Sequence, residues 1–503
     1  MNDQVHLVHK GASLSAQSAT PRAFTSYRDR LDVGVLTAAI PADLVDEVID
    51  QAGCRELRNR RLPARVVVYF VLGWCLFSAA DRFCPPGYRA VVRALTGRWS
   101  SVLSGAAHVS SSALTQARQR LGSKPLQLLF DRVRGPAATT PQPWSHAFGR
   151  RVVAWDATTI AVPDSPDNAA AFGYQGHGAK RPARLGRGCG SATGANPLLR
   201  LMTLIECGTH AIIDAVFDGV ARASEIALAK QLIASLAPGM LLLADRMFLS
   251  DPLWNAAAAT GADLVWRAKS NIYLVATKRL PDDSYLAVLP TQKEAKRLGN
   301  LRPHGRRNQI PREGHQVRVV EFTITIHTST GAIRTENYRL VTTLLDHTDA
   351  PATQIAALYH QRWESETGYS QLKPRLVGAD VTLRSRTPDG IAQETYAFLV
   401  IYQALTTLRV DAATAARLDP DRISFLITIR AVRADITNHA RRSPAGRRRT
   451  VITEMISEQL GPRRPRTSPR QRIPATGKYT NKRRDQPRPS AKTRTEITIT
   501  APN

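Results

Sequence analysis

The sequence is poor in cysteine and in long apolar runs. Its 503 residues include only five cysteines, which are widely scattered and form no CxxC or Cys/His cluster. A disulfide framework and a zinc site are therefore not expected. No run of about 18 apolar residues occurs, so a membrane-spanning helix is not expected either. The first residues, Met1 to Ser26, lack an apolar signal core, which predicts a chain that stays in the cytoplasm.

Acidic residues are few for a chain of this length. There are 41 Asp and Glu against 69 Lys and Arg, which gives a formal net charge of +28. Such an excess is typical of proteins with a polyanionic partner, and nucleic acid is the first candidate. A charged membrane surface is the alternative.

Apolar periodicity and composition divide the chain into segments. The hydrophobic content of 43% is ordinary for a globular protein, and the length allows two or three domains. Helical patterns precede a linker at Gly135–Pro143, strands alternate with helices after it, and period-two alternation then predicts an antiparallel sheet. The expected segments are a flexible leader (1–30), a helical amino-terminal domain (31–135), the first part of an α/β core (145–270), a β-rich insertion (271–345), the last part of the core with carboxy-terminal helices (346–437) and a basic, disordered tail (438–503).

One helix of the amino-terminal segment has a polar and basic character. Serines at 110–112 can cap it, and it runs to Leu121 with Gln116, Arg118, Gln119 and Arg120. Helices of this kind lie in a major groove or along phosphates. A helical bundle with a basic surface explains the same residues, and no distinct helix-turn-helix signature decides between the two interpretations.

A second helix carries a cluster of polar side chains on one side. It is predicted between Pro351 and Pro374, since proline rarely lies inside a helix. At about 100° per residue, four of its residues share a face roughly 60° wide, whereas Glu364 falls on the far side. Taken alone, this face is equally well explained as a solvated surface with an i, i+4 ion pair worth ~0.2–0.5 kcal/mol. The four residues are Tyr359, Arg362, Glu366 and Lys373.

Two further carboxylates follow apolar, strand-like runs. Asp156 follows a valine-rich run, and Asp245 follows Met240–Ala244. Singly, each has an ordinary explanation, as a turn carboxylate or as a partner of Arg246. Together with Glu366 they predict a metal site, because clustered carboxylates repel unless a cation compensates them. Oxygen ligands favour Mg²⁺, and two such ions about 3.5–4 Å apart activate a water or a 3′-hydroxyl for in-line displacement at a phosphate.

These residues resemble the DDE transposases of bacterial insertion sequences. Tyr359, Arg362, Glu366 and Lys373 match that family's Y-x2-R-x3-E-x6-K signature at each spacing. The run Asp245-Arg246-Met247-Phe248 is similar to the motif around the second aspartate, and Asp156 matches the first. Residues 61–70 and 112–121 are similar to the helical domain of the insertion-sequence-four branch. The likeness covers roughly residues 35 to 410, and it departs from the family at Gly368-Tyr369, where bulkier apolar residues are usual.

The resemblance implies an α/β fold, with a ribonuclease-H-like catalytic core, a β-rich insertion and an all-helical amino-terminal DNA-binding domain. It implies that Asp156, Asp245 and Glu366 bind two Mg²⁺ ions, for which Mn²⁺ can substitute. The implied contacts to DNA come from Tyr359, Arg362, Lys373 and Arg246.

The implied function is that of a transposase, acting in the bacterial cytoplasm near the nucleoid. It would bind the ends of its insertion sequence in double-stranded DNA, cut them through a hairpin and join the 3′-hydroxyl ends to target DNA. Because two ends must be brought together, a dimer on DNA is expected. The alternatives are a metal-dependent nuclease without strand transfer and a non-catalytic DNA-binding relative, against which the intact carboxylates argue.

Overall fold

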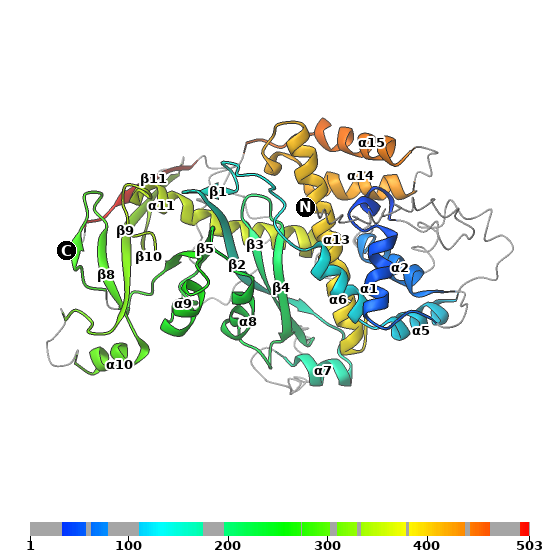
Figure 1. Cartoon of the computed structure of the whole chain (residues 1–503), viewed down its shortest axis with the longest axis horizontal. Coiled ribbons are helices and arrows are strands. Elements are labelled where there is room, and N and C mark those ends of the chain that lie inside the picture. Colours follow the sequence, from blue (N-terminus) through cyan, green and yellow to red (C-terminus); the bar gives the residue numbers. More distant parts are fainter. Residues whose placement is uncertain are drawn as a thin grey trace, which may run out of the picture.

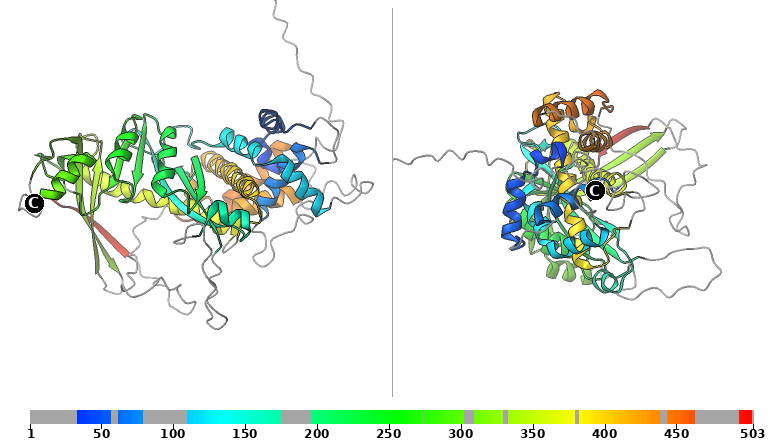
Figure 2. Two further views of the ribbon diagram at one scale, coloured as in Figure 1. Left: turned by 90° about the horizontal axis from the view of Figure 1, so that it is seen from below. Right: turned by 90° about the vertical axis from the view of Figure 1, so that its right-hand side faces the viewer.

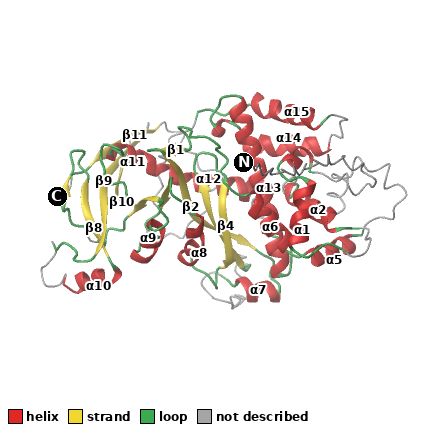
Figure 3. Ribbon diagram, in the orientation of Figure 1, coloured by secondary structure: helices red, strands yellow, loops and turns green. Residues whose placement is uncertain are grey.

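The molecule is elongated, with helices gathered at one end and the strands of the insertion at the other (Figure 1, Figure 3). The predicted leader, 1–30, lies outside the described part of the chain. Among the residues described, no helix combines the length and the apolar character needed to cross a bilayer. The computed structural model describes residues 33–56, 62–78, 110–174, 196–272, 274–301, 309–328, 333–378, 382–437, 443–462 and 493–501.

The centre of the molecule is a mixed sheet in the order β4-β3-β2-β5-β6. Strand β3 pairs antiparallel with both β2 and β4, whereas β5 pairs parallel with β2, and β6 pairs parallel with β5. This is the strand order of a ribonuclease-H-like core, so the predicted fold class is confirmed. The apolar run of β5 is buried on both faces, as expected of a central parallel strand. The bounds are β2 (Arg150–Ala161), β3 (Leu198–Glu206), β4 (Ile212–Gly219), β5 (Met240–Ala244) and β6 (Asp263–Arg267).

The β-rich insertion continues this sheet. Its last strand, β10, pairs with β6 through Leu340–Thr342 and so joins the insertion directly to the core. A short strand, β1 (His146–Ala147), pairs with the start of β2. The elements of the insertion are β7 (Lys278–Arg279), β8 (Tyr285–Pro290), α10 (Gln292–Leu301), β9 (Gly314–Thr328) and β10 (Ile333–Thr342).

Two parts of the segment 438–503 form regular elements, contrary to what its composition predicts. It contains α15 (Pro444–Ser457) and β11 (Thr493–Ile499). Strand β11 pairs antiparallel with β9, from Thr328 to Phe322, along the edge of β9 that β8 leaves open. Figure 2 shows this strand against the insertion, far from α15. The prediction of a disordered tail is therefore wrong for α15 and β11, and residues 463–492 lie outside the described part.

Helices cover both faces of the core sheet. On one face, α8 (Glu225–Leu232) and α9 (Asp251–Ala258) pack on Val153, Trp155 and their neighbours. On the other face, α11 (Ala352–Tyr359) packs on Val152, Ala154, Leu241 and Leu243. Successive residues of a strand point to opposite faces, and this alternation decides below which face the carboxylates occupy.

A long buried helix, α13 (Pro388–Ala415), organises the helical end of the molecule. Helices from both ends of the chain share one apolar cluster with it and with β3 and β4. Its proline lies at the first turn, and Thr387 caps the helix by accepting from Gly390 N–H. The surrounding elements are η2 (Gly34–Ala38), α1 (Ala42–Gln51), α2 (Ala64–Leu76), α5 (Ser111–Leu121), α6 (Lys124–Val133), α7 (Pro166–Phe172), α14 (Phe425–Thr437) and α15.

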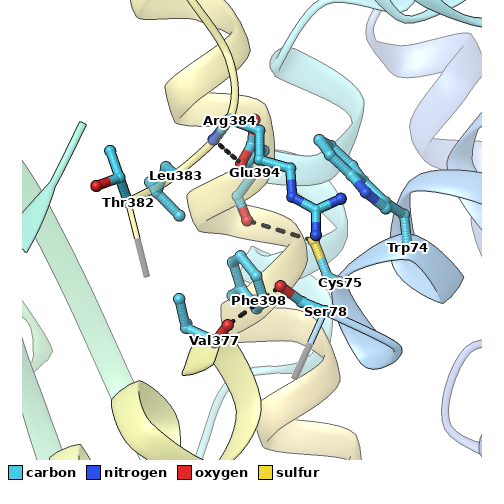
Figure 4. Close-up of a pocket in the computed structure, with 9 residues that line it drawn as sticks. All are labelled: Trp74, Cys75, Ser78, Val377, Thr382, Leu383, Arg384, Glu394 and Phe398. Atoms are coloured by element: carbon cyan, nitrogen blue, oxygen red, sulfur yellow. Dashed lines mark hydrogen bonds between the residues drawn. The ribbon is translucent and has the colours of Figure 1, made fainter. Parts of the chain in front are cut away.

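Arg118 does not face solvent, contrary to the interpretation of its helix as a phosphate-contacting surface. It is 7% exposed, and its Nε donates to Gln393 Oε1 at 2.8 Å. Its guanidinium lies 4.3 Å from the ring centroid of Trp74 and 3.6 Å from Glu394. Figure 4 shows Glu394 and Arg384 beside Trp74 in the small pocket between α2 and α13. Arg118 therefore ties α5 to α13, whereas Gln116, Gln119 and Arg120 are exposed.

We expect Arg118→Ala to lower the free energy of unfolding by about 3 kcal/mol, because it removes a buried ion pair with Glu394 and leaves the side-chain oxygen of Gln393 without its donor. Urea unfolding followed by circular dichroism measures this difference. Arg120→Ala, on the exposed side of the same helix, is the matched control and should change stability by less than about 0.5 kcal/mol. Equal effects of the two substitutions would contradict the structural role of Arg118.

Candidate active site

Asp156 and Asp245 lie side by side because their strands are parallel and in register. The last registered pair of β2 and β5 is Ala154 with Leu243, and each aspartate follows two residues later. Neighbouring strands lie about 4.8 Å apart, so the two carboxylates emerge at one place. Residues two apart in a strand point to the same face, so both aspartates point to the same side of the sheet as Ala154 and Leu243, which pack under α11. They therefore lie on the face covered by the helical run 352–378, which carries Tyr359, Arg362, Glu366 and Lys373 and is called the signature helix below.

The signature helix is a continuous helical run that is not one regular α-helix. After α11 comes a 3₁₀ turn, η5 (His360–Trp363), then α12 (Glu364–Ser370), then a π-helical segment, η6 (Gln371–Gly378). Pro374 lies inside η6 and does not end the run as the sequence predicts. A π turn is a usual way for a helix to take up such an irregularity. The run packs along β2, which brings its polar face to Asp156.

Asp156 is held from both sides by hydrogen bonds. Its Oδ1 accepts from the N–H of Ala157 at 2.8 Å, and its Oδ2 accepts from the Ser365 hydroxyl at 3.2 Å. The nearest guanidinium nitrogen of Arg362 lies 4.0 Å from Oδ2. Burial raises the pKa of Asp156 above its ordinary value, and the charge of Asp245 adds to this, although the hydrogen bonds and Arg362 act in the opposite direction.

Arg362 is the common neighbour of all three predicted carboxylates. Burial lowers the pKa of Arg362, but electrostatic interactions with its neighbours outweigh this effect, so the pKa is raised. Those neighbours are Tyr359, Asp245, Asp156 and Glu366. Glu366 itself is exposed. Arg362 thus interacts electrostatically with all three carboxylates, and its Nε has no hydrogen-bond partner among the described residues.

The other predicted contacts to DNA occupy different environments. The hydroxyl of Tyr359 is buried and donates to the carbonyl of Ala244 at 3.2 Å, and burial raises the pKa of this tyrosine. The Nζ of Lys373 donates to the Thr159 carbonyl at 2.6 Å and to the Thr158 hydroxyl at 3.1 Å, and burial lowers its pKa. Arg246 is exposed directly beside Asp245.

Sequence reasoning missed two residues of the signature helix that touch Asp156. One is Ser365, and the other is Tyr369, whose hydroxyl donates to the Asp156 carbonyl and accepts from the Thr203 N–H. The helical arithmetic contains the signal, because at about 100° per residue both fall next to Arg362 on the polar face. At Gly368-Tyr369, where the sequence departs from the family pattern, Tyr369 therefore forms a hydrogen bond to the backbone of the first aspartate.

Two charged residues from other elements also approach the site. Arg267 follows Trp266, the partner of Ala244 in β6, and its guanidinium lies 4.0 Å from the ring centroid of Tyr338. Glu225 begins α8; burial raises its pKa, and the charges of Asp156 and Asp245 contribute. The positions of Arg267 and Glu225 near the site depend on strand pairing and loop geometry, so they cannot be predicted from the spacing of residues along the chain.

A second group of possible metal ligands lies deeper in the molecule. One ligand atom each from His210, Glu364 and Asp421 lies within 4.8 Å of the others. The Nε2 of His210 is 2.7 Å from Glu364, and its Nδ1 is 3.1 Å from Arg409. Arginine only donates, so Nδ1 accepts and Nε2 carries the proton that Glu364 accepts. The imidazole thus has no lone pair free for a cation.

Comparison with known proteins gives two family matches. Residues 30–131 match the family described as insertion element 4 transposase N-terminal, and residues 147–403, just over half of the chain, match the transposase DDE domain. The transposase InsG for insertion sequence element IS4 of Escherichia coli (strain K12) is 28% identical over 426 residues, which cover 83% of this chain and 85% of that protein.

Two further similarities are weaker. The putative transposase InsZ of the same strain is 26% identical over 230 residues, 45% of this chain and 68% of that protein. A solved piggyBac transposase synaptic complex with hairpin DNA covers 84% of each chain at 10% identity, with a TM-score of 0.42.

We expect Asp156→Asn to stabilise the folded chain at neutral pH in the absence of metal. Because the pKa of Asp156 is raised in the folded state, the protonated carboxyl favours folding more than the ionised one does. This stabilisation is present at low pH and is lost as the pH rises through the folded-state pKa. Asn keeps an oxygen for the Ala157 N–H and removes the charge. The expected gain is about 1 kcal/mol, a size common for single stabilising substitutions. Urea unfolding in EDTA measures it.

The gain should shrink as the pH falls through the raised pKa, where the wild-type carboxyl is itself protonated. Asp167→Asn, an exposed carboxylate in α7, is the matched control and should alter stability by less than about 0.5 kcal/mol. An Asp156→Asn chain that is less stable than the wild type at neutral pH would show that burial does not set this pKa.

Proposed function

This chain belongs to the insertion-sequence-four family of DDE transposases, and we propose that it cuts the ends of its own insertion sequence through a hairpin and joins the 3′-hydroxyl ends to target DNA. One observation carries the proposal: Asp156 within β2 and Asp245 just after β5 lie at matching positions of two neighbouring parallel strands, and the helical run that carries Glu366 packs on β2. In-line displacement at a phosphodiester requires such a converging set of carboxylates.

Membership in this family implies the use of a divalent metal, and we assign Asp156, Asp245 and Glu366 as ligands of two Mg²⁺ ions, with Mn²⁺ as a substitute. The donor set fits, because it consists of oxygen alone. The upward pKa shift of Asp156 fits as well, since a nearby cation would offset the cost of its ionisation. When bound, the ions would activate a water or a 3′-hydroxyl and stabilise the leaving oxygen.

The cationic side chains around the carboxylates are assigned to the phosphates near the cut. Arg362 offers a buried guanidinium between the three carboxylates, and Arg246 extends into solvent beside Asp245. Lys373 would exchange its hydrogen bonds to β2 for a phosphate oxygen. Tyr359 would likewise have to release the Ala244 carbonyl before its buried hydroxyl could reach DNA.

DNA binding is expected of a transposase, and we assign recognition of the transposon ends to the helical domain. The exposed Gln116, Gln119 and Arg120 of α5 are suited to groove and phosphate contacts, and the net charge of +28 adds non-specific attraction. Because two ends are joined in one reaction, we propose that the protein acts as a dimer on double-stranded DNA, in the cytoplasm at the nucleoid.

We expect Asp245→Asn to reduce cleavage of a DNA fragment carrying the transposon end by about 10³-fold, since metal ligation supplies several kcal/mol at about 1.4 kcal/mol per tenfold in rate. Denaturing gels resolve nicked, hairpin and joined products. Asp167→Asn, on the surface of α7, should cut at the wild-type rate.

The product pattern also separates the rival functions. A hairpin on the excised end, followed by joined product, supports the transposase, whereas nicking of any DNA without hairpins or joining supports a nuclease. If Asp245→Asn cleaves DNA at the wild-type rate, Asp245 is not a metal ligand. If the wild-type chain cleaves no DNA at all, the result supports a non-catalytic relative.

We expect Lys373→Met to weaken binding of end DNA and to lower the slope of log K against log salt by about 1, as loss of one phosphate contact predicts. Fluorescence anisotropy between about 50 and 200 mM salt measures the slope. Lys230→Met, exposed on α8 across the sheet, is the control and should leave the slope unchanged. Identical slopes for wild type and Lys373→Met would mean that Lys373 stays on β2 when DNA is bound.

A further inference from the structure

His210 adopts a backbone conformation that its residue type rarely takes. It ends the tight turn between β3 and β4 with a φ of 65°, and its side chain is fully buried. Glycine would occupy this left-handed region at lower conformational cost. A buried non-glycine residue held there points to a need for its side chain.

The imidazole of His210 connects two helices that are distant in sequence. Its Nε2–H donates to Glu364 in α12 at 2.7 Å. Its Nδ1 accepts from Arg409 in α13 at 3.1 Å and from the amide of Gln371 in η6 at 3.2 Å. Each ring nitrogen thus has a defined partner, which fixes both the tautomer and the orientation of the ring.

The turn that carries His210 is itself fixed to α13. The hydroxyl of Tyr402 donates to the carbonyl of His210 at 3.1 Å, and Arg409 also donates to the carbonyl of Thr209. Both α13 residues are buried. His210 is therefore fixed in place, with one ring nitrogen bonded to α13 and the other to Glu364.

Glu364 and Glu366 project from opposite sides of α12. Two residues correspond to about 200° of helical rotation, so the side chain that is held by His210 lies across the helix from the one assigned to metal. Between them, Ser365 donates to Asp156. A rotation of α12 about its axis would therefore break the His210–Glu364 bond and displace Glu366 together.

We propose that His210 is a positioning residue for Glu366: by holding Glu364 against α13, it fixes the rotation of α12 that presents Glu366 to Asp156 and Asp245. The inference rests on the proposed function, because it assigns Glu366 to the metal. His210 does not touch the reacting atoms, and its effect passes through Glu364 and the helix.

The test compares His210→Ala, Glu364→Ala and Glu364→Gln with the wild-type chain. Single-turnover cutting of pre-bound end DNA should slow on the order of 10²-fold in both alanine variants, the loss expected when a catalytic group moves by about 1 Å. The Kd for end DNA should stay at the wild-type value. Glu364→Gln keeps an oxygen that accepts from Nε2–H and should cut within a few-fold of wild type.

Metal affinity gives a readout that does not require catalysis. Tb³⁺ is a hard cation that takes oxygen ligands, and its luminescence reports occupancy of the carboxylate site. Both alanine variants should need more Tb³⁺ for half-saturation, by roughly tenfold. The double variant should be no worse than either single variant, because the two residues act through one contact. Arg417→Gly, an exposed residue with φ 55°, is the matched control and should match wild type in every measurement.

A merely structural role predicts a different result. If His210→Ala lowers the melting temperature but leaves both the rate of the bound complex and Tb³⁺ half-saturation unchanged, the proposal is overturned. Multiplied losses in the double variant would overturn it too. Should His210→Ala fail to fold, a Glu364→Ala chain with the wild-type cutting rate and Tb³⁺ half-saturation would also overturn the proposal. A wild-type chain that binds Tb³⁺ but never cuts ends refutes the proposed function, while the Tb³⁺ comparison still tests the positioning.

Discussion

Two carboxylates that repel each other, Asp156 and Asp245, are held at matching positions of two neighbouring parallel strands, and the packing of both faces of the sheet keeps them there. Parallel pairing of β2 with β5 fixes their separation and places both on one face of the sheet. The other face is packed against α8 and α9, so the strands cannot twist away from each other without opening the core. The signature helix then supplies Arg362, whose charge offsets part of the repulsion. The pKa of Asp156 is nevertheless raised, mainly because the carboxyl is buried and to a smaller degree because of the charge of Asp245.

Much of this arrangement could be predicted from the sequence, because it depends on local patterns. The buried β5 run, the aspartate after it and the spacing of the signature residues are all visible along the chain. The contacts of Ser365 and Tyr369 follow from the same helical spacing but need the position of β2 to acquire meaning. The approach of Arg267 depends on strand pairing alone, which spacing does not encode.

The errors have physical causes of the same kind. Arg118 has the polarity of a surface residue, but Trp74, Gln393 and Glu394 from other helices provide a buried environment that satisfies its charge. Pro374 was expected to end a helix, whereas the π-helical turn accommodates it. Composition averaged over 438–503 hid the alternating residues of β11, since many prolines and arginines surround them. For Arg118 and β11, contacts with distant parts of the chain outweigh the local preference, whereas Pro374 is accommodated by the local helix geometry.

The pairing of β11 with β9 has a consequence for how the chain is made. Strand β9 is synthesised long before residues 493–499, so one edge of its distal half stays without a partner while the helical end of the molecule is translated. An unpaired edge attracts other strands, and Ile497 and Ile499 add apolar cover beside Phe322 and Tyr359 only when they arrive. A nascent chain that stops before these residues carries the three carboxylates and a complete signature helix, yet lacks the strand that closes the sheet beside that helix.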